Sequence, residues 1–218
     1  MGRYELILFD LDGTLIDSVD DITVLVNRAM RELGEKEHTR DVIGGFIGNG
    51  AENLIACSLP GGREHPGFGE ALRIFREGYL QQDARDTKIF DGIYDVLDRL
   101  SDEGYKLAVI SNKFRAASEE IVKACFDGYF DLTLGESPEM ARKPAPDMVV
   151  CALKQLDCER GRAVLIGDSE VDIKTAENAG IDCISATWGL RTEQCLRENG
   201  AQTVIHRPQD ILQAIESA

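Results

Sequence analysis

Side chains that could carry out phosphoryl transfer stand at four places along this 218-residue chain, each beside a short apolar run. Asp10 and Asp12 follow the first run, and Ser111 follows a later one. A lysine beside prolines and two more carboxylates come further on: Lys143, Asp168, Asp172. Carboxylate, hydroxyl and ammonium groups suit this reaction, because its catalysis is mainly positioning and neutralisation of charge.

The aspartates suit different tasks. A carboxylate is a competent nucleophile toward phosphorus and forms an acyl phosphate, a role that Asp10 could fill. Asp12, two residues on, could pass a proton to the leaving oxygen and later accept one from water. Mg²⁺ is usually held by one or two carboxylates, substrate phosphate and several waters, so Asp10 and Asp168 are candidate ligands. Ser111 and Lys143 would then neutralise the remaining phosphoryl charge.

The apolar runs predict the strands that position these groups: residues 6–9, 107–110, 132–134, 163–166, 183–186 and 203–205. They are continuous rather than alternating, which is typical of a sheet covered on both faces. Helical patterns stand between them, so we expect an α/β fold with a doubly wound, Rossmann-like parallel sheet. Such sheets bind ligands at the carboxyl ends of their strands, where the clusters above should meet.

One segment interrupts the alternation. From about Ser18 to Gln82 the pattern is helix after helix, with apolar residues at helical spacing and no convincing strand. We therefore expect a helical cap at residues 17–83, inserted into an α/β core made of residues 1–16 and 84–218. The predicted linkers lie near Ile16-Asp17 and Asp83–Asp91.

Composition narrows the possible partners. The formal net charge is -15, which disfavours binding to nucleic acid or to a membrane surface. No apolar run approaches the ~18 residues that span a bilayer, and the six cysteines are dispersed without a C-x-x-C pair. These features predict a cytoplasmic protein whose partner is a small phosphorylated metabolite, with an oligomeric state that the sequence leaves open.

The motifs occur in an order that resembles the haloacid dehalogenase-like hydrolase superfamily, and the resemblance covers essentially the whole chain, including the helical insertion. The matching motifs are Asp10-Leu-Asp-Gly-Thr, Ser111, Lys143-Pro-Ala-Pro and Gly167-Asp-Ser followed by Asp172. The second aspartate of the first motif argues against dehalogenation, because the dehalogenases of this superfamily lack it and its phosphatases and phosphomutases have it.

The resemblance implies a role for each motif. Asp10 would be the nucleophile, and Asp12 the general acid/base with its backbone carbonyl also on Mg²⁺. Asp168 would bind the metal directly, and Asp172 through water or a neighbouring ligand. The groups implied for the phosphoryl oxygens are Ser111 and Lys143. Asn112 is a further candidate through its backbone N–H, because we expect it at a helix start, where phosphate binds readily.

Within the superfamily, residues 46–54 and Ser111-Asn-Lys resemble phosphoglycolate phosphatases. A small pyrophosphatase or a sugar phosphomutase on the same fold remains an alternative. A phosphoaccepting receiver module is the non-enzyme alternative, although it would need no inserted cap. The roles of Lys113 and of the Gly/Pro-rich segment 60–67 stay open at this stage.

The cap should select the substrate, because the core motifs bind only a phosphoryl group and a metal, and Gly48-Asn49-Gly50 is our candidate for the selecting loop. Two glycines around a small amide let the backbone and Asn49 approach a ligand closely. We expect Asn49→Ala to lower kcat/KM for a two-carbon acidic ester such as phosphoglycolate and to leave an aryl phosphate nearly unchanged. If both values move together, or neither moves, the loop is only a turn between helices.

Overall fold

The computed structural model describes residues 2–84 and 87–217, and a six-stranded parallel sheet forms its centre. The strand order is β3-β2-β1-β4-β5-β6, the order of a doubly wound Rossmann-like sheet. The strands are β1 (Leu6–Phe9), β2 (Lys106–Phe114), β3 (Leu132–Glu136), β4 (Ala163–Gly167), β5 (Asp182–Ala186) and β6 (Thr203–Ile205). The predicted α/β fold class is therefore confirmed.

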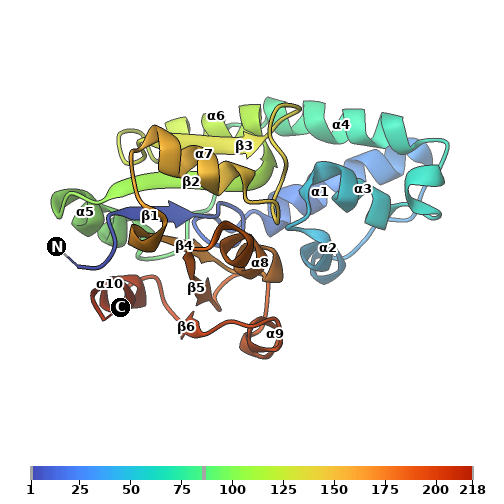
Figure 1. Ribbon diagram of the computed structural model, residues 1–218. Coiled ribbons are helices and arrows are strands. Elements are labelled where there is room, and N and C mark those ends of the chain that lie inside the picture. Colours follow the sequence, from blue (N-terminus) through green and yellow to red (C-terminus); the bar gives the residue numbers. More distant parts are fainter. Residues whose placement is uncertain (1, 85–86, 218) are drawn as a thin grey trace.

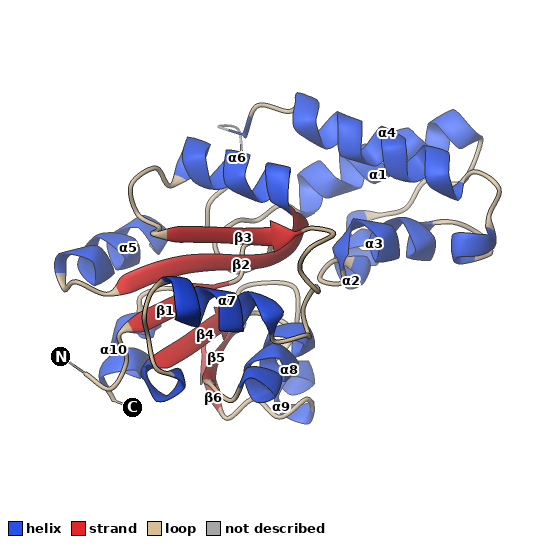
Figure 2. Ribbon diagram, turned by 45° about the horizontal axis from the view of Figure 1, so that its top comes forward, coloured by secondary structure: helices blue, strands red, loops and turns tan. Residues whose placement is uncertain are grey.

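Both faces of the sheet are buried, as its continuous apolar runs require. All four residues of β1 are buried, and Leu6 and Leu8 pack on one face while Ile7 and Phe9 pack on the other. Helices α7 and α8 cover the first face, and α5, α6 and α10 cover the second (Figure 2). These and the remaining core helices are α5 (Ile93–Asp102), α6 (Arg115–Cys125), α7 (Asp147–Gln155), α8 (Glu170–Ala179), α9 (Glu193–Glu198) and α10 (Asp210–Glu216), with a short 3-10 turn at Arg160–Arg162.

A group of helices is inserted between β1 and β2: α1 (Val19–Leu33), α2 (Arg40–Phe46), α3 (Gly50–Ser58), η1 (Gly62–Glu64) and α4 (Phe68–Gln81). In Figure 1 these helices lie beyond the carboxyl ends of the central strands, toward which the arrows of β1 and β3 point. They make a layer of their own, in which α1 packs along α4 through Leu25, Val26 and Phe75. The insertion is thus placed to cover the strand ends.

The two linkers to this insertion run side by side. Ile16 and Ile89 form an antiparallel bridge, and the Asp17 N–H donates to the Lys88 carbonyl at 2.8 Å. Residues 85–86 of the predicted second linker lie outside the described residues. The division at residues 17 and 83 stays a prediction, since the helices alone do not fix where one unit ends.

Strand β2 differs from the prediction in one respect that matters for the site. It runs to Phe114, four residues beyond the predicted run, and its register with β3 shifts between Ile110 and Phe114. Residues 111–113 thereby oppose the single residue Gly135 of β3. A local bulge of this kind re-aims side chains at a strand end. No helix of the described part of the chain is long and apolar enough to cross a membrane.

Candidate active site

Asp10 leaves the end of β1 and is held there by a buried lysine. The Lys143 ammonium lies 2.7 Å from Asp10 Oδ1, which also accepts from the Leu11 N–H at 2.7 Å. Lys143 is 2 % exposed, so this ion pair is desolvated and its charges are weakly screened. Within the described residues, the hydrogen bonds of Asp10 involve Oδ1 alone, which leaves its second oxygen available as a nucleophile.

Asp168 is fully buried at the end of β4, the strand beside β1. Its carboxylate accepts from the Thr14 hydroxyl at 3.1 Å and from the Leu190 backbone N–H at 2.6 Å. Gly13 and Gly189 close against it, and a Cβ at either position would overlap the carboxylate. The two glycines therefore let the backbone wrap the Asp168 side chain more tightly than any other residue could.

Asp172 joins the cluster from the first turn of α8. It forms a capping box with Ser169, whose hydroxyl donates to Asp172 Oδ2 at 2.6 Å. Its other oxygen accepts from the Lys143 ammonium at 2.7 Å, so Lys143 bridges Asp172 and Asp10. Asp172 therefore both starts its helix and anchors the lysine, which suits an indirect role at a metal better than a direct one.

These three carboxylates fit a divalent cation. Oxygens of Asp10, Asp168 and Asp172 lie within 4.8 Å of one another, and all three side chains are buried. A hard cation such as Mg²⁺ takes oxygen ligands of this kind. The Asp12 carboxylate lies outside this group, which leaves its backbone carbonyl as the ligand that the sequence predicts. Asp10, Asp12 and Asp168 thus follow the neighbouring strands β1 and β4, and Asp172 lies in the first turn of α8.

The pKa shifts of the cluster also favour a bound divalent cation. Burial, reinforced by Asp172 and Asp12 and opposed by Lys143, raises the pKa of Asp10 to about 7. Burial also raises the pKa of Asp168 well above its usual range, with the charges of Asp172 and Asp10 adding to the effect. The attraction of Asp10 and Asp172 outweighs burial at Lys143 and raises the pKa of its ammonium. One lysine does not balance three buried carboxylates, and a divalent cation would.

Asp12 is held separately, on the side toward the helical insertion. Its Oδ1 accepts from the Ser18 hydroxyl at 2.5 Å and lies 2.8 Å from the Lys113 ammonium. Ser18 stands directly before α1 of the insertion, whereas Lys113 belongs to β2 of the core, so the insertion and the core hold the same oxygen. The other oxygen of Asp12, which accepts none of these bonds, is free for proton transfer.

The bulge in β2 places two predicted residues, Ser111 and Asn112, at the site. The Ser111 hydroxyl accepts from the Lys113 N–H at 3.1 Å, which leaves its own O–H able to donate. The Asn112 side-chain amide donates at 2.9 Å to both the Gly48 and Lys143 carbonyls. Asn112 thus ties the insertion to the loop that carries Lys143, a side-chain role that the sequence did not indicate. Its Oδ1 is buried and unpaired within the described residues, an acceptor open to water or substrate.

A cavity of about 50 Å³ lies between Asp10 and the helical insertion. The core lines it with polar groups and one ring, and the insertion lines it mainly with apolar groups: Asp10, Asp12, Ser111, Asn112, Lys113 and Phe114 from the core; Ile22, Ile47, Gly48, Gly50, Ala51, Leu54, Phe75 and Tyr79 from the insertion. Gly48 and Gly50 thus reach the cavity as predicted, whereas Asn49 is absent from its lining. The selecting role of Asn49 remains a prediction.

A core loop after β5 contributes groups that the sequence analysis missed. The Arg191 guanidinium pairs with Glu170 at 2.8 Å and donates to the Ile47 carbonyl of the insertion at 3.1 Å. The Trp188 ring N–H donates to the Thr14 carbonyl at 3.1 Å. The signal available in the sequence was modest, namely the chain's only tryptophan followed by a glycine after an apolar run.

Comparisons with known proteins agree with this arrangement. Residues 7–186 match the sequence model of the haloacid dehalogenase-like hydrolases. The phosphoglycolate phosphatase of Aquifex aeolicus (strain VF5) is 34% identical over 212 residues, which cover 97% of this chain and 96% of that protein. The phosphoglycolate phosphatase of Colwellia psychrerythraea (strain 34H / ATCC BAA-681) is 33% identical, covering 91% of each chain. A crystal structure from Lactobacillus delbrueckii subsp. bulgaricus has a TM-score of 0.91 at 31% identity, covering 99% of this chain and 100% of that one.

The pKa values of the cluster give a prediction for metal binding. A carboxyl whose pKa is raised on folding stabilises the folded state below its unfolded pKa near 4, and this stability is lost as the pH rises through about 7. Mg²⁺ binds the ionised form, so it should raise Tm more at about pH 8 than at about pH 5.5. At a hundred times its Kd the cation would add about 2.7 kcal/mol.

The measurement is a set of thermal unfolding curves with Mg²⁺ or with EDTA at both pH values. Asp168→Asn is the control, and it should lose most of the rise in Tm that Mg²⁺ gives to the wild type. An equal or larger rise in Tm at the lower pH would contradict the assignment of the cation to these carboxylates.

Proposed function

The chain belongs to the haloacid dehalogenase-like hydrolase family, and from this premise we propose that it hydrolyses a small phosphate monoester through a phosphoryl group carried on Asp10. One observation carries the proposal. Asp10 and Asp12 each have one carboxylate oxygen fixed by a buried lysine, at 2.7 and 2.8 Å respectively, and both residues line the same small cavity. Two carboxylates with separate anchors can act as nucleophile and as acid/base on one bound group.

In the first step, the free oxygen of Asp10 attacks phosphorus, and the bond between phosphorus and the ester oxygen breaks. The electron pair of that bond goes to the ester oxygen, which takes a proton from Asp12 and leaves as an alcohol. The Ser111 hydroxyl and the Lys143 ammonium neutralise the phosphoryl oxygens while this happens.

In the second step, a water molecule attacks the phosphorus of the phosphorylated Asp10 and gives its proton to the Asp12 carboxylate. The bond between phosphorus and the Asp10 oxygen breaks, which releases inorganic phosphate and restores the free carboxylate. Asp12 regains in this step the proton that it donated in the first, so each turnover is balanced.

Asp10, Asp168 and the Asp12 carbonyl would hold Mg²⁺, with Asp172 contributing through water. When bound, the cation supplies positive charge to the phosphoryl oxygens. Lys143 and the capping box at Ser169 keep the carboxylates in place.

The relatives named as phosphoglycolate phosphatases and the small cavity both support a short acidic ester, with phosphoglycolate as the first candidate. A water needs roughly 10–15 Å³ of such space, so about 50 Å³ has room for a small group beside Asp10.

We expect phosphate release from small esters with Mg²⁺ and none in EDTA. Asp10→Asn keeps the shape of the side chain but removes the attacking charge, so activity should fall to background while the thermal unfolding curve stays cooperative. Substantial turnover by a folded, undeamidated Asp10→Asn protein would exclude the covalent route. Stable stoichiometric phosphorylation of wild type without turnover would instead identify a receiver.

Asp12→Asn should remove proton transfer rather than binding. General acid–base groups contribute about 10²–10⁴-fold, so kcat for an alkyl phosphate should fall by about that factor. An aryl phosphate such as 4-nitrophenyl phosphate should lose less, because its leaving group needs no proton. The measurement is kcat for both esters with the same preparations, and equal losses would argue against the acid role of Asp12.

A further inference from the structure

We propose that Lys113 determines substrate choice, by binding the carboxylate of a short leaving group next to the transferred phosphoryl group. The proposal rests on the proposed phosphatase function and names the chemistry that its substrate must present. Lys113 lies in the bulged stretch of β2, one residue before its end, and is 8 % exposed. It is the one cationic side chain that lines the cavity within the described residues.

The contacts of Lys113 leave it a donor to spare. An ammonium carries three N–H groups. One donates to Asp12 Oδ1 at 2.8 Å, and the nitrogen also stands 4.3 Å from the centre of the Tyr79 ring of α4. Because Lys113 lines the cavity, its remaining N–H group is open to a ligand there.

The molecule already contains the arrangement that we infer. The Lys143 ammonium lies between two carboxylates, Asp10 and Asp172, at 2.7 Å from each. Lys113 holds one carboxylate, Asp12, and has an aromatic face where Lys143 has a second anion. A substrate carboxylate in the cavity would complete the same pattern.

The rest of the cavity wall favours this position for the charge. The insertion contributes apolar side chains there, such as Ile22, Leu54 and Phe75, which have neither a hydrogen-bond donor nor a positive charge for an anion. The first turn of α3 also lines the cavity through Gly50 and Ala51, and the side chain of Asn49, the N-cap residue, makes no capping hydrogen bond to that helix. Its uncapped N–H groups would add to the attraction of Lys113, since the amino end of a helix favours negative charge.

The test compares two esters with the same two-carbon chain, phosphoglycolate and 2-hydroxyethyl phosphate. The ratio of their kcat/KM values isolates the carboxylate, because any effect of Lys113 on Asp12 acts on both esters and cancels. We expect wild type to prefer phosphoglycolate, and Lys113→Met to lower the ratio roughly 10²-fold, as truncation of one partner of a buried charge pair does. Lys113→Arg keeps the charge and should retain most of the wild-type preference for phosphoglycolate.

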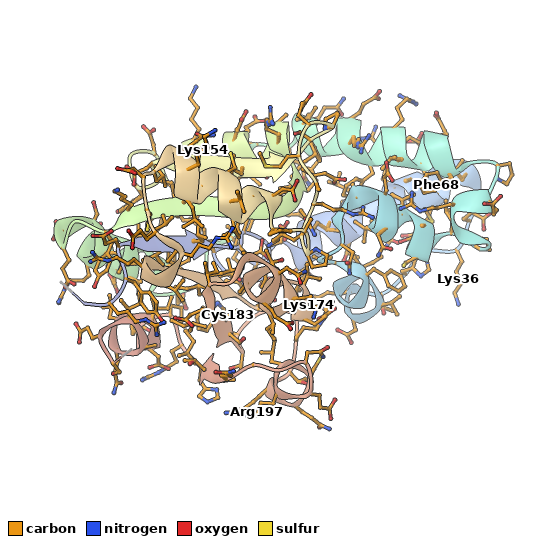
Figure 3. All side chains as sticks on the ribbon, viewed as in Figure 1. Lys36, Phe68, Lys154, Lys174, Cys183 and Arg197 are labelled. Atoms are coloured by element: carbon orange, nitrogen blue, oxygen red, sulfur yellow. The ribbon has the colours of Figure 1, made fainter. Side chains whose placement is uncertain are left out.

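Lys174→Met is the matched control. It removes one lysine charge from the exposed face of α8, where Lys174 pairs with Glu177 on the surface, and should leave the ratio unchanged (Figure 3). Thermal unfolding checks each variant, and Lys113→Gln replaces Lys113→Met if the latter does not fold.

A binding measurement separates this proposal from the phosphatase function. Calorimetry in one Mg²⁺ buffer compares 3-phosphonopropionate with propylphosphonate, which have the same chain with and without the carboxylate and cannot be hydrolysed. Wild type should bind the carboxylate compound more tightly, and Lys113→Met should lose that preference. If wild type hydrolyses no ester, the phosphatase function fails and this pair still decides the role of Lys113.

Two results would overturn the inference. One is a wild-type protein without preference for the carboxylate in either pair of compounds. The other is a Lys113→Met protein that loses activity equally on both esters and keeps its binding preference, as expected if Lys113 only orients Asp12.

Discussion

The concentration of buried negative charge at the carboxyl ends of β1 and β4 is the constraint on which the rest of this structure depends. Burying a carboxylate without a partner costs several kcal/mol, and Asp10, Asp168 and Asp172 share one small volume. The Lys143 ammonium and the backbone N–H of Leu190 offset part of that cost, and they leave negative charge that a cation would neutralise. At such a site the binding of a cation and the ionisation of the carboxylates would be linked.

The topology of the sheet makes this concentration possible. Parallel strands end at one edge, so β1, β2 and β4 deliver groups that are more than a hundred residues apart in the chain to a single place. The helical insertion leaves the core at the same edge, a few residues after Asp12, and its first residues contribute the Ser18 hydroxyl to that aspartate. The candidate site and its cover are therefore products of one arrangement of strands.

Much of this could be predicted from the sequence, because local pattern carries it. Continuous apolar runs fixed the six strands to within a few residues, and the sequence from Asp10 to Thr14 indicated its chemistry by residue type alone. Local pattern could not predict which residues, far apart in the sequence, contact one another in the fold. The bulge that aims Lys113 depends on the register of β2 against β3, and the hydrogen bond from Arg191 to Ile47 joins residues more than 140 positions apart. Such contacts follow from tertiary geometry, for which a single sequence has no periodic signal.

The antiparallel pairing of Ile16 with Ile89 brings the exit and re-entry of the chain to one point of the core. A segment whose ends are already adjacent adds little closure cost to the core, and that cost grows only slowly with segment length. The core therefore does not limit the length of the segment that is inserted there. A gene for this protein could exchange the segment for a larger or smaller one, provided that a hydroxyl still reached Asp12, and so change the outline of the cavity while the charged groups of the core, Lys113 among them, stay the same. The shape of the cavity and its charge can be inherited separately.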